Sequence, residues 1–257
     1  MNRVQLMFQA SQGAGKILQT FFGKKGAVRR KGELDLVTDA DEAAEQHILQ
    51  LIRTHFPQDA ILSEEKGSQP MPDAEFEWII DPLDGTTNFA QGFPHFAVSI
   101  GIRRAGQLYA GCIFDPMKGE FFKAIRGEGA FLNGELIQVG RITQLRDAVV
   151  VTGFPYDRRS RLPELLGRVE RVLNQALGLR RLGAACLDLA YVAAGRLPVF
   201  YEDSLNPWDI AAGILLVEEA GGVVLDFKGQ QASLETGQVI AGNRDLVKET
   251  YQHIICG

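Results

Sequence analysis

The hydrophobic pattern of the first part of the chain is helical. Apolar residues recur every three or four positions over residues 4–21, which predicts an amphipathic helix packed on the body of the protein. A second helix is expected to start near Thr38 or Asp39, where a short polar side chain can cap free N–H groups, and to stop before Pro57. Asp41 then lies in the first turn of this second helix.

The pattern changes to strands after residue 60. Between residues 60 and 139 the apolar residues form short runs rich in branched and aromatic side chains, several of them joined by glycine-containing turns. Such runs predict strands connected as hairpins, and therefore a largely antiparallel sheet. One of these strands is expected to end at Asp81, where the chain turns through Pro82.

Strands and helices alternate in the second half of the chain. Helices are predicted over residues 163–177, 185–194 and 207–220, with strands between them, which indicates α/β layering. We therefore expect an N-terminal α+β part over residues 1–145 and a C-terminal α/β part over residues 146–257. Because the boundary is a change of pattern rather than a flexible linker, the two parts are expected to pack as one rigid unit with a cleft between them.

The composition is that of an ordinary globular protein. The 257 residues are 46% hydrophobic and 23% charged, which argues against disorder. The formal net charge of −5 gives no overall attraction to nucleic acid or acidic membranes, and it would repel an anionic substrate unless cations changed the local potential. Metal ions are therefore an early candidate for a cofactor.

Cysteine use and the N-terminal segment favour a cytoplasmic protein. The three cysteines include no CxxC pair, so neither a disulfide framework nor a thiolate zinc site is indicated. Polar residues interrupt the apolar positions of residues 1–22, so this segment lacks the continuous hydrophobic stretch of a signal peptide or a membrane span. We expect a protein of the reducing cytoplasm, without export.

The most informative segment reads WIIDPLDGTTNF. It places Asp81 and Asp84 on one turn after an apolar strand, and the residues that follow Asp84 look like the start of a helix. The free N–H groups of Gly85 and Thr86 could then face an anion with the helix dipole behind them. In isolation, such a pair of acids would only end a strand and cap a helix. The complete pattern favours metal ligands beside a phosphate cradle.

Two further segments carry acids at the ends of predicted elements. In NPWDIAAGILLVEEAGG, Asn206 is placed to cap a helix, Pro207 takes its first position and Asp209 lies in its first turn. Taken alone, Asp209 would complement the helix dipole rather than bind a ligand. In LSEE, Glu64 and Glu65 follow an apolar strand, where solvated end charges are the plain interpretation.

Together these acids indicate a site for a hard cation. Glu64, Asp81, Asp84 and Asp209 offer only oxygen ligands, with no cysteine and no well-spaced histidine pair, which favours Mg²⁺ or Mn²⁺ over Zn²⁺. The basic run at residues 24–31 lacks interleaved aromatic residues and is expected to be a solvated loop rather than a nucleic-acid site. Neither a P-loop nor a GxSxG nucleophile turn is present in the sequence.

The two long motifs resemble the signatures of a known enzyme family. WIIDPLDGTTNF and WDIAAGILLVEEAGG are similar, in order and separation, to the two signature motifs of the inositol monophosphatases. LVTDADEAAEQHI, LSEEKG and RRLGAACLDLAYVAAGR also look like family segments, so the resemblance covers nearly the whole chain, and it is greatest to bacterial SuhB-type members. The resemblance implies a layered αβαβα fold, a homodimer, inhibition by Li⁺, and up to three Mg²⁺ ions for which Mn²⁺ can substitute.

The resemblance also implies how the metals are held. Glu64, Asp81 and the carbonyl of Leu83 would hold the first metal ion. Asp81, Asp84 and Asp209 would hold the second, and Glu64 would help to hold a weaker third.

Catalytic and substrate-binding roles follow in the same way. Asp41 and the hydroxyl of Thr86 would orient and deprotonate the attacking water, which with Glu64 makes the implied catalytic set. The N–H groups of Gly85 and Thr86 would bind phosphate. The substrate hydroxyls would meet Asp84, Glu202, Asp209 and the backbone of Gly183, Ala184 and Ala185.

The function implied is that of a Mg²⁺-dependent phosphomonoesterase that hydrolyses myo-inositol 1-phosphate by attack of water. Other phosphatases of the superfamily remain open as alternatives, acting on fructose-1,6-bisphosphate, histidinol phosphate, NADP(H) or a 3′-phosphoadenosine nucleotide. A regulatory role is the alternative of a different class, because SuhB-type members can associate with the transcription machinery. The intact carboxylate set argues against a chain that has abandoned catalysis, and no membrane or direct nucleic-acid partner is expected.

Overall fold

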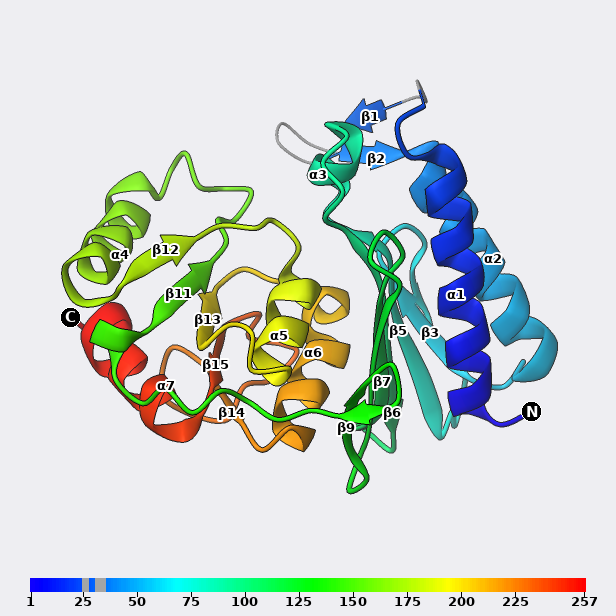
Figure 1. Ribbon diagram of the computed structural model, residues 1–257. Helices are drawn as coiled ribbons and strands as arrows, with labels where there is room; N and C mark the ends of the chain where they lie inside the picture. Colours follow the sequence, from blue (N-terminus) through cyan, green and yellow to red (C-terminus); the bar gives the residue numbers. More distant parts are fainter. Residues whose placement is uncertain (25–27, 31–35) are drawn as a thin grey trace.

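The computed structural model describes residues 1–24, 28–30 and 36–257. Helices and sheets stack in alternating layers across the molecule, with the two termini at opposite ends (Figure 1). The layers are, in order, α1 (Arg3–Phe21) with α2 (Asp39–His55), an eight-stranded sheet, α5 (Ala185–Ala193) with α6 (Pro207–Glu219), a five-stranded sheet, and α4 (Leu162–Gln175) with α7 (Arg244–Thr250). The expected layered αβαβα fold is confirmed.

The first two helices begin and end where their polar residues indicate. The side chain of Asn2 accepts the N–H of Gln5, and the side chain of Gln5 accepts the N–H of Asn2, both at 2.9 Å, which caps α1. At the start of α2, Asp41 accepts the N–H of Thr38 at 2.8 Å, and the helix ends before Pro57 as expected. Part of the predicted basic loop, residues 25–27 and 31, lies outside the described residues.

The first sheet is antiparallel except at one pair of strands. Its strand order is β10-β9-β8-β7-β6-β5-β3-β4, and only β3 and β5 are parallel. The predicted hairpins are confirmed. The strands are β3 (Ala60–Ser63), β4 (Gly67–Gln69), β5 (Phe76–Asp84), β6 (Ala97–Arg104), β7 (Gln107–Asp115), β8 (Glu120–Ile125), β9 (Gly129–Leu132) and β10 (Glu135–Leu136); a separate hairpin joins β1 (Val28–Arg30) to β2 (Leu36–Thr38).

The prediction that a strand ends at Asp81 is wrong, because β5 continues to Asp84. Asp81 lies opposite Ser99 of β6, whereas Asp84 lies opposite Ala97, so the register shifts by one residue between them. Pro82, which has no N–H to donate, stands inside this bulge. The bulge places both acids near one end of the strand, just before the short helix α3 (Thr86–Ala90).

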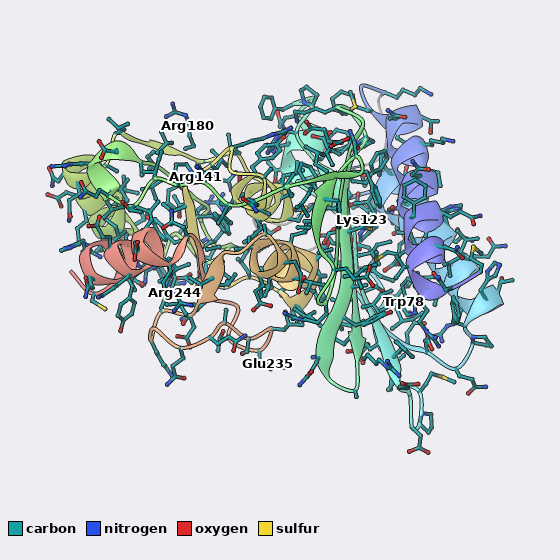
Figure 2. All side chains as sticks on the ribbon, turned by 60° about the horizontal axis from the view of Figure 1, so that its bottom comes forward. Trp78, Lys123, Arg141, Arg180, Glu235 and Arg244 are labelled. Carbon is teal, nitrogen blue, oxygen red and sulfur yellow. The ribbon has the colours of Figure 1, made fainter. Side chains whose placement is uncertain are left out.

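The face of β5 that points toward α1 and α2 carries Trp78, which is fully buried (Figure 2). Its indole N–H donates to Asp59 at 2.8 Å, and Arg3 of α1 makes two hydrogen bonds to the same carboxylate. This polar link satisfies the buried indole and joins the outer helix layer to the sheet.

The second sheet is mixed, as α/β layering predicts. Its order is β12-β11-β13-β15-β14; β11 is parallel to β12 and β13, and β15 is antiparallel to β13 and β14. The short edge strand β12 was not predicted, and the division of the chain at residues 145 and 146 stays a prediction. The strands are β11 (Val149–Thr152), β12 (Gly178–Arg180), β13 (Val199–Glu202), β14 (Val223–Leu225) and β15 (Val239–Gly242).

Helix α6 lies directly on the first sheet. A Cβ atom added to Gly101 would meet the Cβ of Ala211 at 2.8 Å, and one added to Gly111 would meet the Cα of Ala212 at 2.9 Å. These separations leave no room for a side chain between the helix and strands β6 and β7. The first turn of α6 is thereby fixed against the sheet that carries Asp81.

None of the helices in the described part of the chain is both long enough and apolar enough to cross a membrane. The cytoplasmic location stays a prediction.

Candidate active site

One cavity brings the predicted site residues together. It has a volume of about 330 Å³ and lies where β5, α5, α6 and the end of β13 meet. All the predicted metal ligands and substrate contacts line this cavity. Of the predicted site residues, only Asp41 is not part of the lining. The predicted residues in the lining are Glu64, Asp81, Leu83, Asp84, Gly85, Thr86, Gly183, Ala184, Ala185, Glu202 and Asp209.

Asp41 reaches the cavity through Thr86. The Thr86 hydroxyl lies 3.2 Å from Oδ1 of Asp41 and 2.9 Å from the carbonyl oxygen of Leu83. The other carboxylate oxygen of Asp41 accepts both the N–H and the hydroxyl of Thr38, at 2.8 and 2.5 Å. Burial raises the pKa of Asp41, and these hydrogen bonds oppose the shift. The pair of Thr86 and Asp41 forms a short path along which a proton can leave the cavity.

The turn after β5 depends on glycine. Gly85 has φ 90° and occupies the N-cap position of α3, so Asp84 does not cap this helix as its position in the motif suggested. The Asp84 carboxylate instead accepts the N–H of Cys186 at 2.7 Å, across the cavity wall. A Cβ at Gly85 would lie 3.0 Å from the carbonyl oxygen of His95 and 3.3 Å from the Cβ of Ala184.

Asn88 joins the first motif to the segment just before α5. Its side-chain amide donates to the carbonyl oxygens of His95, Leu182 and Gly183, at 2.9, 3.0 and 3.3 Å. Sequence reasoning quoted this residue within the motif but gave it no role. Its place in the motif was the only signal for a role, because two of its three partners, Leu182 and Gly183, lie far along the chain.

The proposed metal ligands of the cavity form a group of acids that a bound cation would stabilise. Burial raises the pKa of Asp81 and Asp209 well above the ordinary range, and repulsion from Glu64 and Asp84 adds to both shifts. Burial also raises the pKa of Asp84. Because every donor is a hard oxygen, a divalent cation such as Mg²⁺ fits the chemistry of this group.

The carboxylates are not yet arranged as a ligand sphere. As the side chains stand, no group of three or more Asp, Glu, His or Cys residues in the described part of the chain is positioned to hold a metal ion. Asp84 accepts the N–H of Cys186 at 2.7 Å, and Asp209 accepts the N–H of Asn206 at 2.7 Å at the start of α6. Each of these hydrogen bonds uses the Oδ2 atom, one of the two oxygens of its carboxylate.

Glu202 also lines the cavity and lies against Gly153. A Cβ at Gly153 would stand 2.1 Å from both carboxylate oxygens of Glu202, so a larger residue here would displace the acid from its present position. Burial raises the pKa of Glu202 to about 8, with Arg181 opposing the shift and Asp84 and Asp203 adding to it. A carboxyl group in this position can accept a hydrogen bond from a group in the cavity and, in its protonated form, can also donate one.

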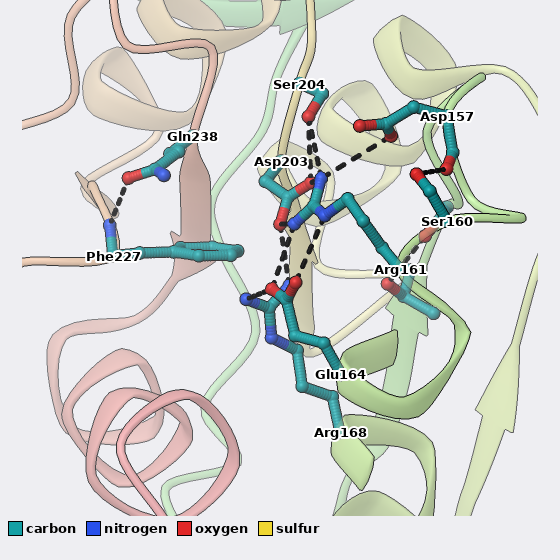
Figure 3. A network of polar contacts seen from close by, with 11 residues as sticks. Asp157, Ser160, Arg161, Glu164, Arg168, Asp203, Ser204, Phe227 and Gln238 are labelled. Atoms are coloured by element: carbon teal, nitrogen blue, oxygen red, sulfur yellow. Dashed lines mark hydrogen bonds and ion pairs between the residues drawn. The ribbon is translucent and has the colours of Figure 1, made fainter. Parts of the chain in front are cut away.

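The residue after Glu202 is held by a charged network (Figure 3). Arg161 contacts both oxygens of Asp203 at 2.8 Å, and Arg168 contacts one of them at 2.6 Å. Glu164 accepts from both arginines, and the Arg168 guanidinium lies 4.7 Å from the ring centroid of Phe227. Although burial raises the pKa of Asp203, the two arginines bring it below the ordinary value. The network fixes the end of β13 relative to α4 and to the loop after β11.

Sequence reasoning missed several residues of the cavity wall. They lie in residues 153–159, which received no role, and in residues 180–196, where roles were given only to Gly183, Ala184 and Ala185. Their position depends on long-range packing, which residue spacing does not reveal. The missed lining residues include Gly153, Tyr156, Arg158, Arg181 and Asp188.

Comparisons with known proteins agree with this geometry. The model of the inositol monophosphatase family matches residues 2–256. Nus factor SuhB of Escherichia coli (strain K12) is 42% identical over 247 residues, covering 95% of this chain and 92% of that protein.

Solved structures show the same likeness. The extragenic suppressor protein suhB from Bartonella henselae has a TM-score of 0.94 at 40% identity, covering 98% of this chain and 97% of that one. The inositol monophosphatase from Anabaena (Nostoc) sp. PCC 7120 has a TM-score of 0.88 at 38% identity, covering 98% and 94%. The chain therefore belongs to the inositol monophosphatase family, whose members are generally metal-dependent phosphatases.

Proposed function

We propose that this protein is a Mg²⁺-dependent phosphomonoesterase that hydrolyses myo-inositol 1-phosphate to myo-inositol and phosphate. The observation that carries the proposal is the meeting of four carboxylates from three separate segments at one cavity beside the Gly85 turn. Such a cluster is costly without a cation, and a phosphate ester is the kind of anion that a cation-loaded acidic cavity attracts. The carboxylates are Glu64, Asp81, Asp84 and Asp209.

Two groups of residues would hold the metal ions. Glu64, Asp81 and the Leu83 carbonyl would hold one, and Asp81, Asp84 and Asp209 another, with Glu64 assisting at a third. When bound, Mg²⁺ supplies the positive charge that stabilises the transferring phosphoryl group and its leaving oxygen.

The residues around the Gly85 turn would transfer the proton of the attacking water and bind the phosphate. The Thr86 hydroxyl would accept a proton from the attacking water while giving its own proton to Asp41, 3.2 Å away. The N–H groups of Gly85 and Thr86 would bind the phosphate, and this positioning would lower the entropic part of the barrier. The hydroxyls of the substrate would bind to Asp84, Glu202, Asp209 and the backbone of Gly183, Ala184 and Ala185.

A phosphate-release screen tests this function. The substrates are myo-inositol 1-phosphate, fructose-1,6-bisphosphate, histidinol phosphate, NADP(H) and a 3′-phosphoadenosine nucleotide, each with Mg²⁺ and with EDTA. We expect the highest kcat/KM with myo-inositol 1-phosphate and no turnover in EDTA. A higher kcat/KM for another compound would identify that compound as the preferred substrate of the same reaction. Phosphate release that continues in EDTA would contradict the metal-dependent mechanism.

Mg²⁺ is expected to stabilise the folded protein, and more at about pH 8 than at about pH 5.5. Burial raises the pKa values of Asp81, Asp84 and Asp209, and repulsion adds to the shifts of Asp81 and Asp209, so the metal-free folded chain binds more protons than the unfolded chain above about pH 4. Stability from these groups is full below that pH and is lost as pH rises through the raised pKa values. Mg²⁺ binds the ionised forms, so its affinity increases over the same range.

Calorimetric melting with MgCl₂ and with EDTA measures this effect. At a free Mg²⁺ concentration a hundred times Kd the gain is about 2.7 kcal/mol, which corresponds to roughly 5–10 °C for a chain of this size. NaCl at equal ionic strength is the control. If Mg²⁺ increased the stability more at the acidic pH, the carboxyl groups with raised pKa values would not be the groups that bind Mg²⁺.

Glu202→Ala is expected to narrow the preference for a polyol phosphate. The Glu202 carboxylate is fixed against Gly153 and has a pKa of about 8, so a substrate hydroxyl is a suitable partner for it. We compare kcat/KM for myo-inositol 1-phosphate with kcat/KM for a simple alkyl phosphate. The free energy that corresponds to the ratio of these two values should fall by roughly 1–3 kcal/mol. Glu202→Gln, which keeps an acceptor oxygen, should lose less, and an unchanged ratio in Glu202→Ala would remove this residue from the substrate site.

A second candidate function is association with the transcription machinery. It is favoured by the relatives that are called Nus factors, at 42% identity over most of the chain. A pull-down from cell extract, with the wild type beside a catalytically inactive variant, tests this role separately from hydrolysis. Capture of transcription proteins by both would show that the two functions coexist, and capture by neither would contradict the second one.

We also propose that the protein is a homodimer. Helix α4 supports this, because its outer face exposes leucines that recur at helical spacing, a pattern that suits burial against a second helix. Light scattering on the full chain measures the mass directly. The exposed leucines are Leu162, Leu166, Leu173 and, just beyond the helix, Leu177.

A further inference from the structure

Asp188 is a buried acid whose carboxylate lacks a full set of partners. Its side chain, on helix α5, is only 1% exposed and lines the same cavity as the proposed metal ligands. Within the described part of the chain, no group hydrogen-bonds its Oδ1 atom. An unpaired polar atom at such a position is costly, so a fold that keeps it there needs a donor from elsewhere.

Asp188 lies close to residues that are proposed to contact the substrate. Its N–H donates to the carbonyl oxygen of Ala184 at 3.0 Å, so it stands one helical turn beyond the segment proposed to meet the substrate. Burial raises the pKa of Asp188 well above its ordinary value; repulsion from Glu202 and Asp84 adds to the shift, and Arg181 opposes it. The positive charge of Arg181 also opposes the raised pKa of Glu202, so one guanidinium interacts electrostatically with both acids.

We propose that Asp188 is a specificity-determining residue that, with Glu202 and Arg181, forms a subsite for two neighbouring hydroxyl groups of a polyol phosphate. This deepens the proposed function and rests on it for the reaction. A hydroxyl donates one hydrogen bond and accepts others, so each of two hydroxyls can donate to one acid while accepting from the guanidinium. An alkyl or aryl phosphate would bury the same acids without pairing them, which lowers its kcat/KM.

The kinetic test compares two substrates in four proteins. We would measure kcat/KM for myo-inositol 1-phosphate and for p-nitrophenyl phosphate in wild type, Asp188→Leu, Asp188→Asn and Asp115→Asn. Asp115 is a matched control because it is equally buried but lies on β7, outside the cavity lining, where it binds Lys118. The ratio of inositol phosphate to aryl phosphate should fall about 10- to 100-fold in Asp188→Leu and less in Asp188→Asn, which keeps one acceptor. The control should keep the wild-type ratio.

A binding measurement separates the subsite from the chemistry. Unphosphorylated myo-inositol, followed by ligand-observed NMR without Mg²⁺, reports on the hydroxyl contacts alone. If the wild type hydrolyses no phosphate but still binds inositol through Asp188, the phosphatase function fails and the polyol subsite survives. An unchanged ratio together with unchanged inositol binding in the Asp188 variants would overturn the subsite, and so would an equal loss in Asp115→Asn. If Asp188→Leu does not fold, as judged by its melting curve, the nearly isosteric Asp188→Asn decides.

Discussion

Replacing Asp84 or Asp209 by asparagine is expected to abolish turnover while leaving the fold intact. Each change removes the charge of one proposed ligand, and with it metal affinity and stabilisation of the transferring phosphoryl group. We expect kcat/KM at saturating Mg²⁺ to fall by on the order of 10² or more. The asparagine oxygen can still accept the N–H of Cys186 or Asn206, so the local backbone keeps its hydrogen bond.

The melting temperature separates this interpretation from simple unfolding. Without Mg²⁺, either variant loses one member of a repelling group of buried acids, so its melting temperature should equal or exceed that of the wild type. With Mg²⁺, the variants should gain less stability than the wild type does. Wild-type activity in either variant would contradict the assignment of these residues as ligands.

Thr86→Ala is expected to slow hydrolysis by about 10² to 10⁴ while Mg²⁺ binding stays close to normal. The change deletes a hydroxyl placed between Asp41 and the Leu83 carbonyl, at 3.2 and 2.9 Å, and leaves every carboxylate ligand in position. The attacking water then loses the group that orients it and accepts its proton. Single-turnover rates and Mg²⁺ calorimetry on the same preparation measure the two effects.

Thr86→Ser is the matched control for this variant, because it keeps the hydroxyl and removes only a methyl group. We expect it to retain most of the wild-type rate. If calorimetry shows that Thr86→Ala chiefly loses metal affinity, the residue belongs to the ligand sphere rather than to the proton path.

Local patterns in the sequence predicted most of the helices and strands, whereas the layered αβαβα order was implied by the family resemblance. The start of α2 at Thr38 follows from a local capping pattern, and the hairpins follow from glycine-containing turns, so neither depends on distant residues. The end of β5 was wrong because the bulge between Asp81 and Asp84 is defined by pairing with β6. Local sequence indicated a turn after Asp81, whereas the paired strand carries the ladder on to Asp84.

The site was less predictable from the residues than the fold was. Each acid alone had an ordinary interpretation as a strand end or a helix-dipole partner, and only the family resemblance joined them before the structure did. Asp188 and Gly153 were missed for a physical reason. The role of Gly153 comes from its close approach to Glu202, and that of Asp188 from its place on the cavity wall, and neither contact has a short-range signature.

The close contact of α6 with Gly101 and Gly111 fixes how the segments that carry the proposed metal ligands lie relative to one another. Asp81 lies on β5 and Asp209 on α6, and the span between them is set where the helix lies on the sheet with no side chain between them. Other parts of the cavity wall, residues 153–156 and 204–206, are loops, so mutation can reshape them while the proposed metal ligands keep their spacing. A chain built in this way could acquire a new substrate without moving the proposed metal ligands.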